Sequence, residues 1–100
     1  MSTEIKIDEK ITVSLQPPKM WKVIFLNDNH TPMDFVIGLL TTIFKHDADK
    51  ARDLTLEVHN EGAAVVGVYA HEIAEQKGLE STQLARTNGF PLKVTLEQES

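Results

Sequence analysis

The fold is decided by residues 21–33, which read WKVIFL followed by NDNHTPM. The first six residues are aromatic, β-branched or aliphatic and have the length of a strand, so they predict a buried strand. The next three, Asn-Asp-Asn, have short polar side chains that bend the backbone well and tolerate left-handed conformations. Thr31 then predicts a helix N-cap, with Pro32 at the first helical position and Asp34 near the positive end of the helix. We therefore expect a strand, a polar loop and a helix in immediate succession.

The rest of the chain predicts two further helices and two further strands. Asp47 can cap the second helix, Gly62 is a natural left-handed stop at its end, and Gly78 weakens the third helix by about 1 kcal/mol relative to alanine. In chain order, the elements after the first strand are helices over 32–46 and 48–61, a strand over 62–69 whose glycines indicate close approach, a helix over 70–88 and a half-exposed strand over 92–97. This β-α-α-β-α-β order predicts an α+β fold, a three-stranded antiparallel sheet packed against three helices.

One hundred residues normally form one domain around one core. Residues 1–19 are charged, lack periodicity and end in two prolines, so we expect a mobile N-terminal extension before a core of 20–97 and a C-terminal tail of 98–100. Residues 11–15 alternate apolar and polar side chains, which leaves a short edge strand as the alternative for that part of the extension.

Composition excludes several classes of function. With 41% apolar and 25% charged residues, the chain is typical of a globular protein. Its net charge of −5 and scattered basic residues argue against a nucleic-acid partner. The lack of cysteine excludes disulfides and thiolate metal sites. The sequence shows neither a signal peptide nor a membrane span, so we expect a cytoplasmic protein with no membrane partner.

The polar loop also carries candidate chemistry. Asn27 and Asp28 offer hydrogen-bond acceptors, and His59, near the negative C-terminal end of a predicted helix, can accept through a ring nitrogen when neutral. Acceptors beside an apolar hole suit a small cationic group. Taken alone, the same residues can be turn formers and a partly buried histidine.

A metal site is the enzymatic alternative for these residues. Asp28, His30 and His59 resemble a two-histidine, one-carboxylate set. The sequence contains no phosphate loop, cysteine nucleophile, serine elbow or paired catalytic carboxylates to accompany them. We therefore expect no enzyme activity, no bound metal and no cofactor.

Four separated stretches carry a resemblance to a known family. They are NDNHTPMDFV at 27–36, VHNEG at 58–62, GVYAHEIAEQK at 67–77 and PLKVTLE at 91–97. In this order and spacing they resemble the ClpS family of adaptors. The resemblance implies that the chain recognises the N-terminal residue of a protein substrate, an N-degron, and delivers the substrate to the N-terminal domain of the ClpA-type unfoldase of the ClpAP protease. It also implies a fold of three helices on a three-stranded antiparallel sheet, in agreement with the predicted order.

The resemblance assigns roles to particular residues. It implies that Asn27 and His59 hold the substrate α-amino group, directly or through water, beside Asp28 and Asn29. The implied walls of the side-chain pocket are Met33, Val36, Thr55, Val58 and Leu92, with Met33 as the gate against β-branched residues. The implied contacts with the unfoldase are Tyr69, Glu72 and Lys77.

Two positions depart from the family pattern. Asn29 stands where a second acidic residue is usual, so charge-based attraction of the ammonium should be weaker. Thr55 stands where a methionine is usual, which predicts a wider or wetter pocket and an altered ranking among Phe, Tyr, Trp and Leu. The alternative function is a general protein-interaction module on the same fold, without N-terminal selectivity. In either case we expect a monomer.

Overall fold

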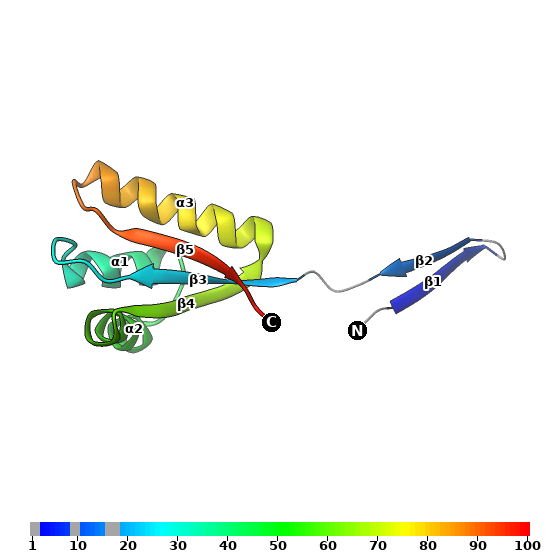
Figure 1. Ribbon diagram of the computed structural model, residues 1–100, viewed down its shortest axis with the longest axis horizontal. Coiled ribbons are helices and arrows are strands. Elements are labelled where there is room, and N and C mark those ends of the chain that lie inside the picture. The colour runs from blue at the N-terminus through cyan, green and yellow to red at the C-terminus, as the bar shows by residue number, and fades with distance from the viewer. Residues whose placement is uncertain (1–2, 9–10, 16–18) are drawn as a thin grey trace.

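The computed structural model describes the backbone of residues 3–8 and 11–15, and both backbone and side chains of residues 19–100 (Figure 1). In chain order from Met20, the elements are β3 (Met20–Leu26), α1 (Met33–Thr42), α2 (Ala48–Glu61), β4 (Ala63–Ala70), α3 (His71–Thr87) and β5 (Lys93–Gln98). The predicted α+β class and the order β-α-α-β-α-β are confirmed for this part of the chain.

The N-terminal extension contains two strands. β1 (Thr3–Asp8) and β2 (Ile11–Leu15) pair antiparallel with each other in a sheet of their own. A strand over 11–15 was the alternative interpretation, but its partner is β1 and not an edge of the main sheet. The two prolines that close the extension, Pro17 and Pro18, lie outside the described residues, and the mobility of the extension stays a prediction.

β3 is the central strand of the main sheet, whose order is β4-β3-β5 and whose pairs are both antiparallel. Val23 and Phe25 of β3 are fully buried and pack in one core with Leu39 and Leu40 of α1. In Figure 1, α3 lies beside β5 and α2 beside β4. β5 extends to Gln98, which pairs with Trp21, so the sheet includes the first residue of the predicted C-terminal tail.

An irregularity in β4 explains its glycine. The register with β3 shifts so that Val66 has no partner, and the Val66 carbonyl instead lies 2.6 Å from Nε2 of His46. Beyond this bulge the Tyr69 ring covers Gly67, where an added Cβ would lie 2.5 Å from ring atoms. The sequence predicted that another group would approach the glycines of this strand closely. At Gly67 that group is the side chain of Tyr69, from the same strand.

The ends of α2 agree with the sequence prediction. The Asp47 side chain accepts a hydrogen bond from the Lys50 amide at 2.7 Å and caps the helix. At the other end Gly62 has a φ of 90°, the left-handed conformation that glycine adopts without steric cost. The end of α2 is thereby placed where β4 begins.

The ends of α1 differ from the prediction. The helix begins at Met33, with Pro32 in the N-cap position, and Thr31 does not cap it. Thr31 lies one residue before the N-cap, and its hydroxyl donates to the Asp28 carboxylate at 2.8 Å. The helix also ends at Thr42, earlier than expected, because Lys45 takes a left-handed φ of 61° that a helix cannot continue through.

Candidate functional site

A pocket of about 300 Å³ lies where the end of β3, the start of α1 and the end of α2 meet. Every residue that the sequence assigned to α-amino binding lines it, as do four of the five assigned to side-chain binding. The full lining is Asn27, Asp28, Asn29, Thr31, Pro32, Met33, Val36, Thr55, Val58 and His59. The structure thus brings these residues, distant in sequence, together around one pocket, and their roles in binding stay predictions.

The pocket has a polar mouth and an apolar floor. Asn27, Asn29 and His59 are exposed, and Met33 stands beside them with 37% of its surface exposed. The floor is formed by Val36, Thr55 and Val58, which are all buried. A ligand with a polar group next to an apolar group matches this division.

Leu92 does not line this pocket. It is 1% exposed and lines a separate cavity of about 20 Å³ whose other walls include Asn27, Asp28, Val36 and Val58. Because the floor residues Val36 and Val58 line both the main pocket and this cavity, the buried Leu92 lies next to the floor. Leu92 therefore lies outside the lining of the main pocket, and its contact with a bound side chain stays a prediction.

The Asp28 carboxylate organises the loop before α1. Oδ1 accepts from the amides of His30 at 2.8 Å and Thr31 at 2.7 Å, and Oδ2 accepts from the Thr31 hydroxyl. Burial opposes ionisation of Asp28, but these hydrogen bonds and the charge of His30 outweigh it and lower the pKa of Asp28 below 3.8. The loop therefore keeps a carboxylate at the pocket, with both oxygens engaged in its own structure.

Asn27 and His59 are brought together by the backbone. The backbone amide of Asn27 donates to the backbone carbonyl of Gly62 at 2.9 Å, which joins the end of β3 to the end of α2. His59 lies in the last turn of α2, where the partial negative charge of the helix end favours a nearby cation. The side-chain amide oxygen of Asn27 and a ring nitrogen of His59 are potential hydrogen-bond acceptors in the lining of the same pocket.

Thr55 adds no free hydrogen-bond donor to the pocket floor. Its hydroxyl donates to the Ala51 carbonyl one turn earlier in α2, at 2.8 Å. The hydrogen-bonding demand of the hydroxyl is thus met inside the helix. Compared with methionine, threonine leaves a wider floor, and this bond makes the floor less wet than the residue type alone suggests.

The three predicted unfoldase contacts do not form one cluster. Lys77 Nζ donates to the Ile43 carbonyl at 2.7 Å and lies 5.3 Å from the centre of the Tyr69 ring and 5.8 Å from that of Phe44. Burial raises the pKa of Tyr69. The Lys77 ammonium is thus bound within the molecule.

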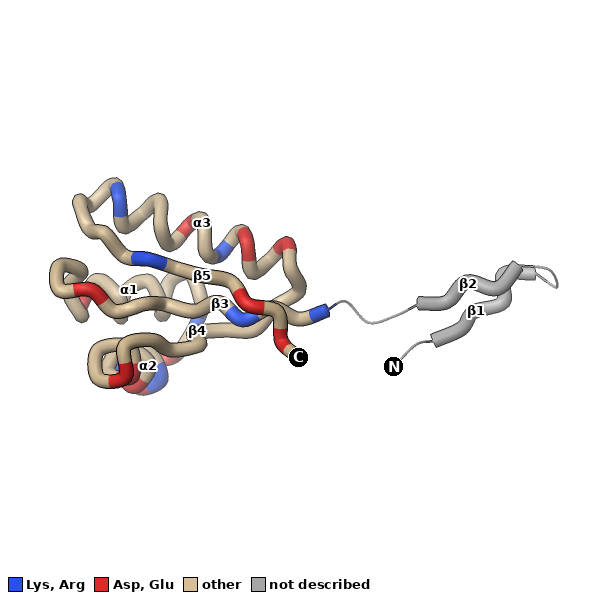
Figure 2. Tube along the Cα trace, viewed as in Figure 1, with Lys and Arg blue, Asp and Glu red and all other residues tan. Residues whose placement is uncertain are grey.

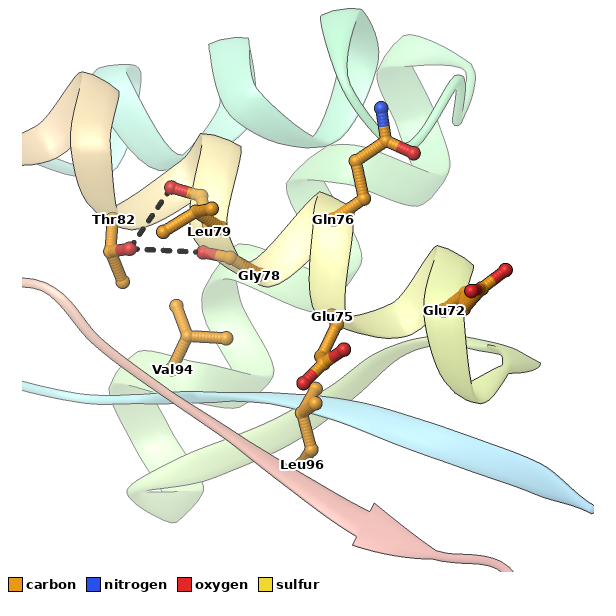
Figure 3. Close-up of a pocket in the computed structure, with 8 residues that line it drawn as sticks. All are labelled: Glu72, Glu75, Gln76, Gly78, Leu79, Thr82, Val94 and Leu96. Atoms are coloured by element: carbon orange, nitrogen blue, oxygen red, sulfur yellow. Dashed lines mark hydrogen bonds between the residues drawn. The ribbon is translucent and has the colours of Figure 1, made fainter.

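Glu72 faces a different feature, an apolar groove between α3 and β5. Figure 3 shows Glu72 at one end of the groove, Glu75 over Leu96 of β5, and Val94 of β5 below Gly78 and Thr82 of α3. Gly78 of α3 lies against β5 here, and an added Cβ would make ordinary van der Waals contact with Val94 at 3.6 Å and Leu96 at 3.7 Å. The Leu79 side chain is 58% exposed.

The other charged residues of the described part of the chain form neither a basic surface nor a metal site. Figure 2 shows acidic and basic residues interspersed along the core, without a basic stripe. Among the described residues, no three His, Asp or Glu side chains are placed to hold a metal ion. Within the same part of the chain, no helix is both long and apolar enough to cross a bilayer.

Sequence reasoning missed two residues of the site, Thr31 and Pro32, which it assigned only to the start of the helix. Thr31 was assigned to capping, yet it lines the pocket and supplies two of the three hydrogen bonds to Asp28. The sequence did contain a signal, because Asp28 lies three residues before Thr31. At this spacing an aspartate side chain can accept hydrogen bonds from the threonine across a tight loop.

Fold and pocket together define a small α+β binding protein, with polar acceptors at the mouth of one pocket and buried aliphatic groups at its base. Comparison with known proteins then identifies the family. Residues 16–95 match the model of "ATP-dependent Clp protease adaptor protein ClpS". The chain belongs to the ClpS family of Clp protease adaptors.

Individual relatives agree over nearly the whole chain. The ClpS adapter of Bdellovibrio bacteriovorus is 44% identical over 99 residues, which cover 99% of this chain and 87% of that protein. That of Escherichia coli O1:K1 is 45% identical over 91 residues, 91% of this chain and 86% of the relative. Among solved structures, Agrobacterium tumefaciens ClpS2 bound to L-phenylalaninamide superposes with a TM-score of 0.80 at 42% identity, covering 83% of this chain and all of that one.

The Asp28 bonds predict a pH-dependent contribution to stability. Asp28→Ala should lower the free energy of unfolding by about 2 kcal/mol at neutral pH, and Thr31→Val, which removes one of the bonds, by about 1 kcal/mol. Because folding lowers the pKa of Asp28, its ionised form stabilises the fold above pH 3.8, and this contribution is lost as the pH falls through the lower folded value. Urea unfolding of both variants at pH 7 and pH 3 tests this. A deficit for Asp28→Ala that is as large at pH 3 as at pH 7 would contradict it.

The contacts of Lys77 predict a role in stability. Lys77→Met keeps the length of the side chain but loses the ammonium, so the Ile43 carbonyl and two aromatic rings lose a partner. The free energy of unfolding should fall by on the order of 1 kcal/mol. Lys93→Met, at an exposed position of β5, is the matched control and should unfold like the wild type. Identical unfolding curves for the two variants would show that Lys77 is a free surface charge.

Proposed function

We propose that this ClpS-family protein binds the N-terminal residue of other proteins when that residue has a free α-amino group and a bulky hydrophobic side chain: Phe, Tyr, Trp or Leu. The observation that carries the proposal is the arrangement of the pocket, with Asn27 and His59 at its mouth and Val36 and Val58 at its floor. A free N-terminus presents an ammonium group directly beside one side chain, which is the same division of polar and apolar groups.

The Agrobacterium relative supports this assignment through the chemistry of its ligand. L-Phenylalaninamide has a free α-amino group and a benzyl side chain, and its amide replaces the carboxylate as a peptide bond does. It therefore resembles the first residue of a protein chain.

The expected energetics suit recognition of a single residue. Each hydrogen bond from the ammonium to Asn27 or His59 contributes roughly 1.5 to 3 kcal/mol. Burial of a Phe or Leu side chain against the floor contributes about 1.5 to 3 kcal/mol more. The Asp28 carboxylate adds long-range attraction while its own bonds keep the loop rigid, so little loop entropy is lost on binding.

Delivery to a ClpA-type AAA+ unfoldase is the second part of the proposal. Glu72 lines the end of the groove between α3 and β5 in Figure 3, where a partner can meet both acidic side chains and the exposed Leu79. Tyr69 of β4 does not line this groove, and its ring centre lies 5.3 Å from the Lys77 ammonium. We therefore expect Glu72 to contact the unfoldase directly and Lys77 to act mainly by supporting Tyr69.

The proposed function predicts dependence on a free N-terminus. A peptide with an N-terminal Phe should bind at least about tenfold more tightly than its acetylated form, because acetylation removes the charge and donors that Asn27 and His59 engage. His59→Ala should weaken binding of the free peptide by a similar factor, whereas Asn60→Ala, at the exposed neighbouring position outside the pocket lining, should not. Fluorescence anisotropy with labelled peptides measures each affinity. Equal binding of free and acetylated peptides would favour a general interaction module instead.

Thr55 predicts the ranking of N-terminal residues. Thr55→Met should narrow the floor, so that affinity for an N-terminal Trp falls relative to Leu. Thr55→Val should leave the ranking unchanged, because the hydroxyl it removes is already bonded to Ala51. Leu56→Met, at the exposed adjacent position, controls for adding methionine to α2. Four peptides that differ in their first residue provide the comparison, and an unchanged ranking in Thr55→Met would refute the assignment.

A further inference from the structure

Arg86, in the last turn of α3, binds the loop that leads to β5. Its Nη1 donates to the carbonyl of Phe90 at 2.8 Å and to that of Leu92 at 3.0 Å. Both carbonyls lie before the pairing of β5 with β3, which begins at Lys93. One guanidinium nitrogen therefore satisfies two carbonyls that the sheet does not.

The amide side of the same loop is fastened to the helix. The Gly89 amide donates to the Arg86 carbonyl at 3.0 Å and the Phe90 amide to Ala85 at 2.8 Å, while Gly89 takes a left-handed φ of 79°. Pro91 has no amide hydrogen to donate. The loop is thus held by its amides up to Phe90, and beyond that point by the contact of Arg86 with its carbonyls.

This loop supports two walls of the candidate pocket. Leu92 lies next to the floor, in the small cavity that it shares with Val36 and Val58. The Phe90 ring packs edge-on against Phe35 of α1, with 4.9 Å between ring centres. Phe35 precedes Val36 in the helix. A shift of the loop would therefore change the pocket floor in two ways, through Leu92 and through the contact of Phe90 with Phe35.

We propose that Arg86 is a positioning residue for the side-chain pocket. By joining the carbonyls of Phe90 and Leu92, it sets the depth at which Leu92 supports the floor, and so the space open to a large N-terminal side chain. Arg86 lies outside the pocket lining and acts through Leu92. The inference rests on the proposed function, and it assigns Arg86 to selection of the side chain and not to binding of the α-amino group.

The test compares two properties of one variant. Arg86→Gln cannot reach both carbonyls, so affinity for a peptide with an N-terminal Phe should fall about tenfold. Affinity for the same peptide with an N-terminal Ala, which does not reach the floor, should change little. The Phe/Ala ratio therefore falls, while the preference for free over acetylated Ala peptide remains. The matched control is Arg52→Gln, on the exposed side of α2 with Asp49 as its nearest acidic partner at 3.8 Å.

Methyl NMR provides an independent readout. The Leu92 methyl resonances should shift in Arg86→Gln and not in Arg52→Gln. Arg86→Lys keeps one cationic donor, so its Phe/Ala ratio should lie between those of the wild type and Arg86→Gln, and it replaces Arg86→Gln if that variant does not fold.

The possible failures are distinguishable. A wild-type protein that binds free and acetylated Phe peptides equally rejects the proposed function, and this inference with it. If the wild type discriminates between them, an unchanged Phe/Ala ratio in the Arg86 variants overturns the inference alone. This holds even when the variants unfold at a lower temperature, because lower stability without a change in selectivity marks Arg86 as a purely structural residue.

Discussion

The pairing of β3 with β4 on one side and β5 on the other is the constraint on which the pocket depends. Leu26, the last residue of β3, is paired with Ala63 at the start of β4 and with Lys93 at the start of β5. The residues before those partners, Gly62 and Leu92, are therefore delivered to the two sides of the loop that follows β3. A shift of one residue in the register would turn every side chain of a strand to the opposite face of the sheet, so the register is fixed. One central strand therefore places the end of α2 and Leu92 close together.

Internal hydrogen bonds determine which polar groups of the site remain open to a ligand. The oxygens of Asp28 are engaged by His30 and Thr31, and the hydroxyl of Thr55 is engaged by its own helix. The side chains of Asn27 and His59 are exposed at the mouth. The Asp28 carboxylate thus makes the loop rigid, while the side chains of Asn27 and His59 remain accessible to a ligand. This favours tight binding because the loop loses little conformational entropy when the ligand binds.

Much of this arrangement could be predicted from local pattern. Asp47 and Gly62 mark the ends of α2 because capping and left-handed termination depend on residues adjacent in sequence. The same local reasoning misplaced the start of α1, since Thr31 lies one residue before the N-cap and its hydroxyl donates to Asp28. It also could not show that the ammonium of Lys77 reaches the Ile43 carbonyl, 34 residues away in the chain.

The sequence alone was enough to predict the element order and, through four motifs, the family and most of the residues that line the pocket. These follow from periodicity, capping chemistry and recognisable spacing, which are all readable along the chain. Only the tertiary structure decided that Leu92 lies next to the floor, that Thr55 is internally bonded and that Arg86 joins two loop carbonyls. A side chain forms a hydrogen bond with a partner that the packed fold brings within about 3 Å. The residues adjacent to it in sequence do not specify which distant residues become its neighbours.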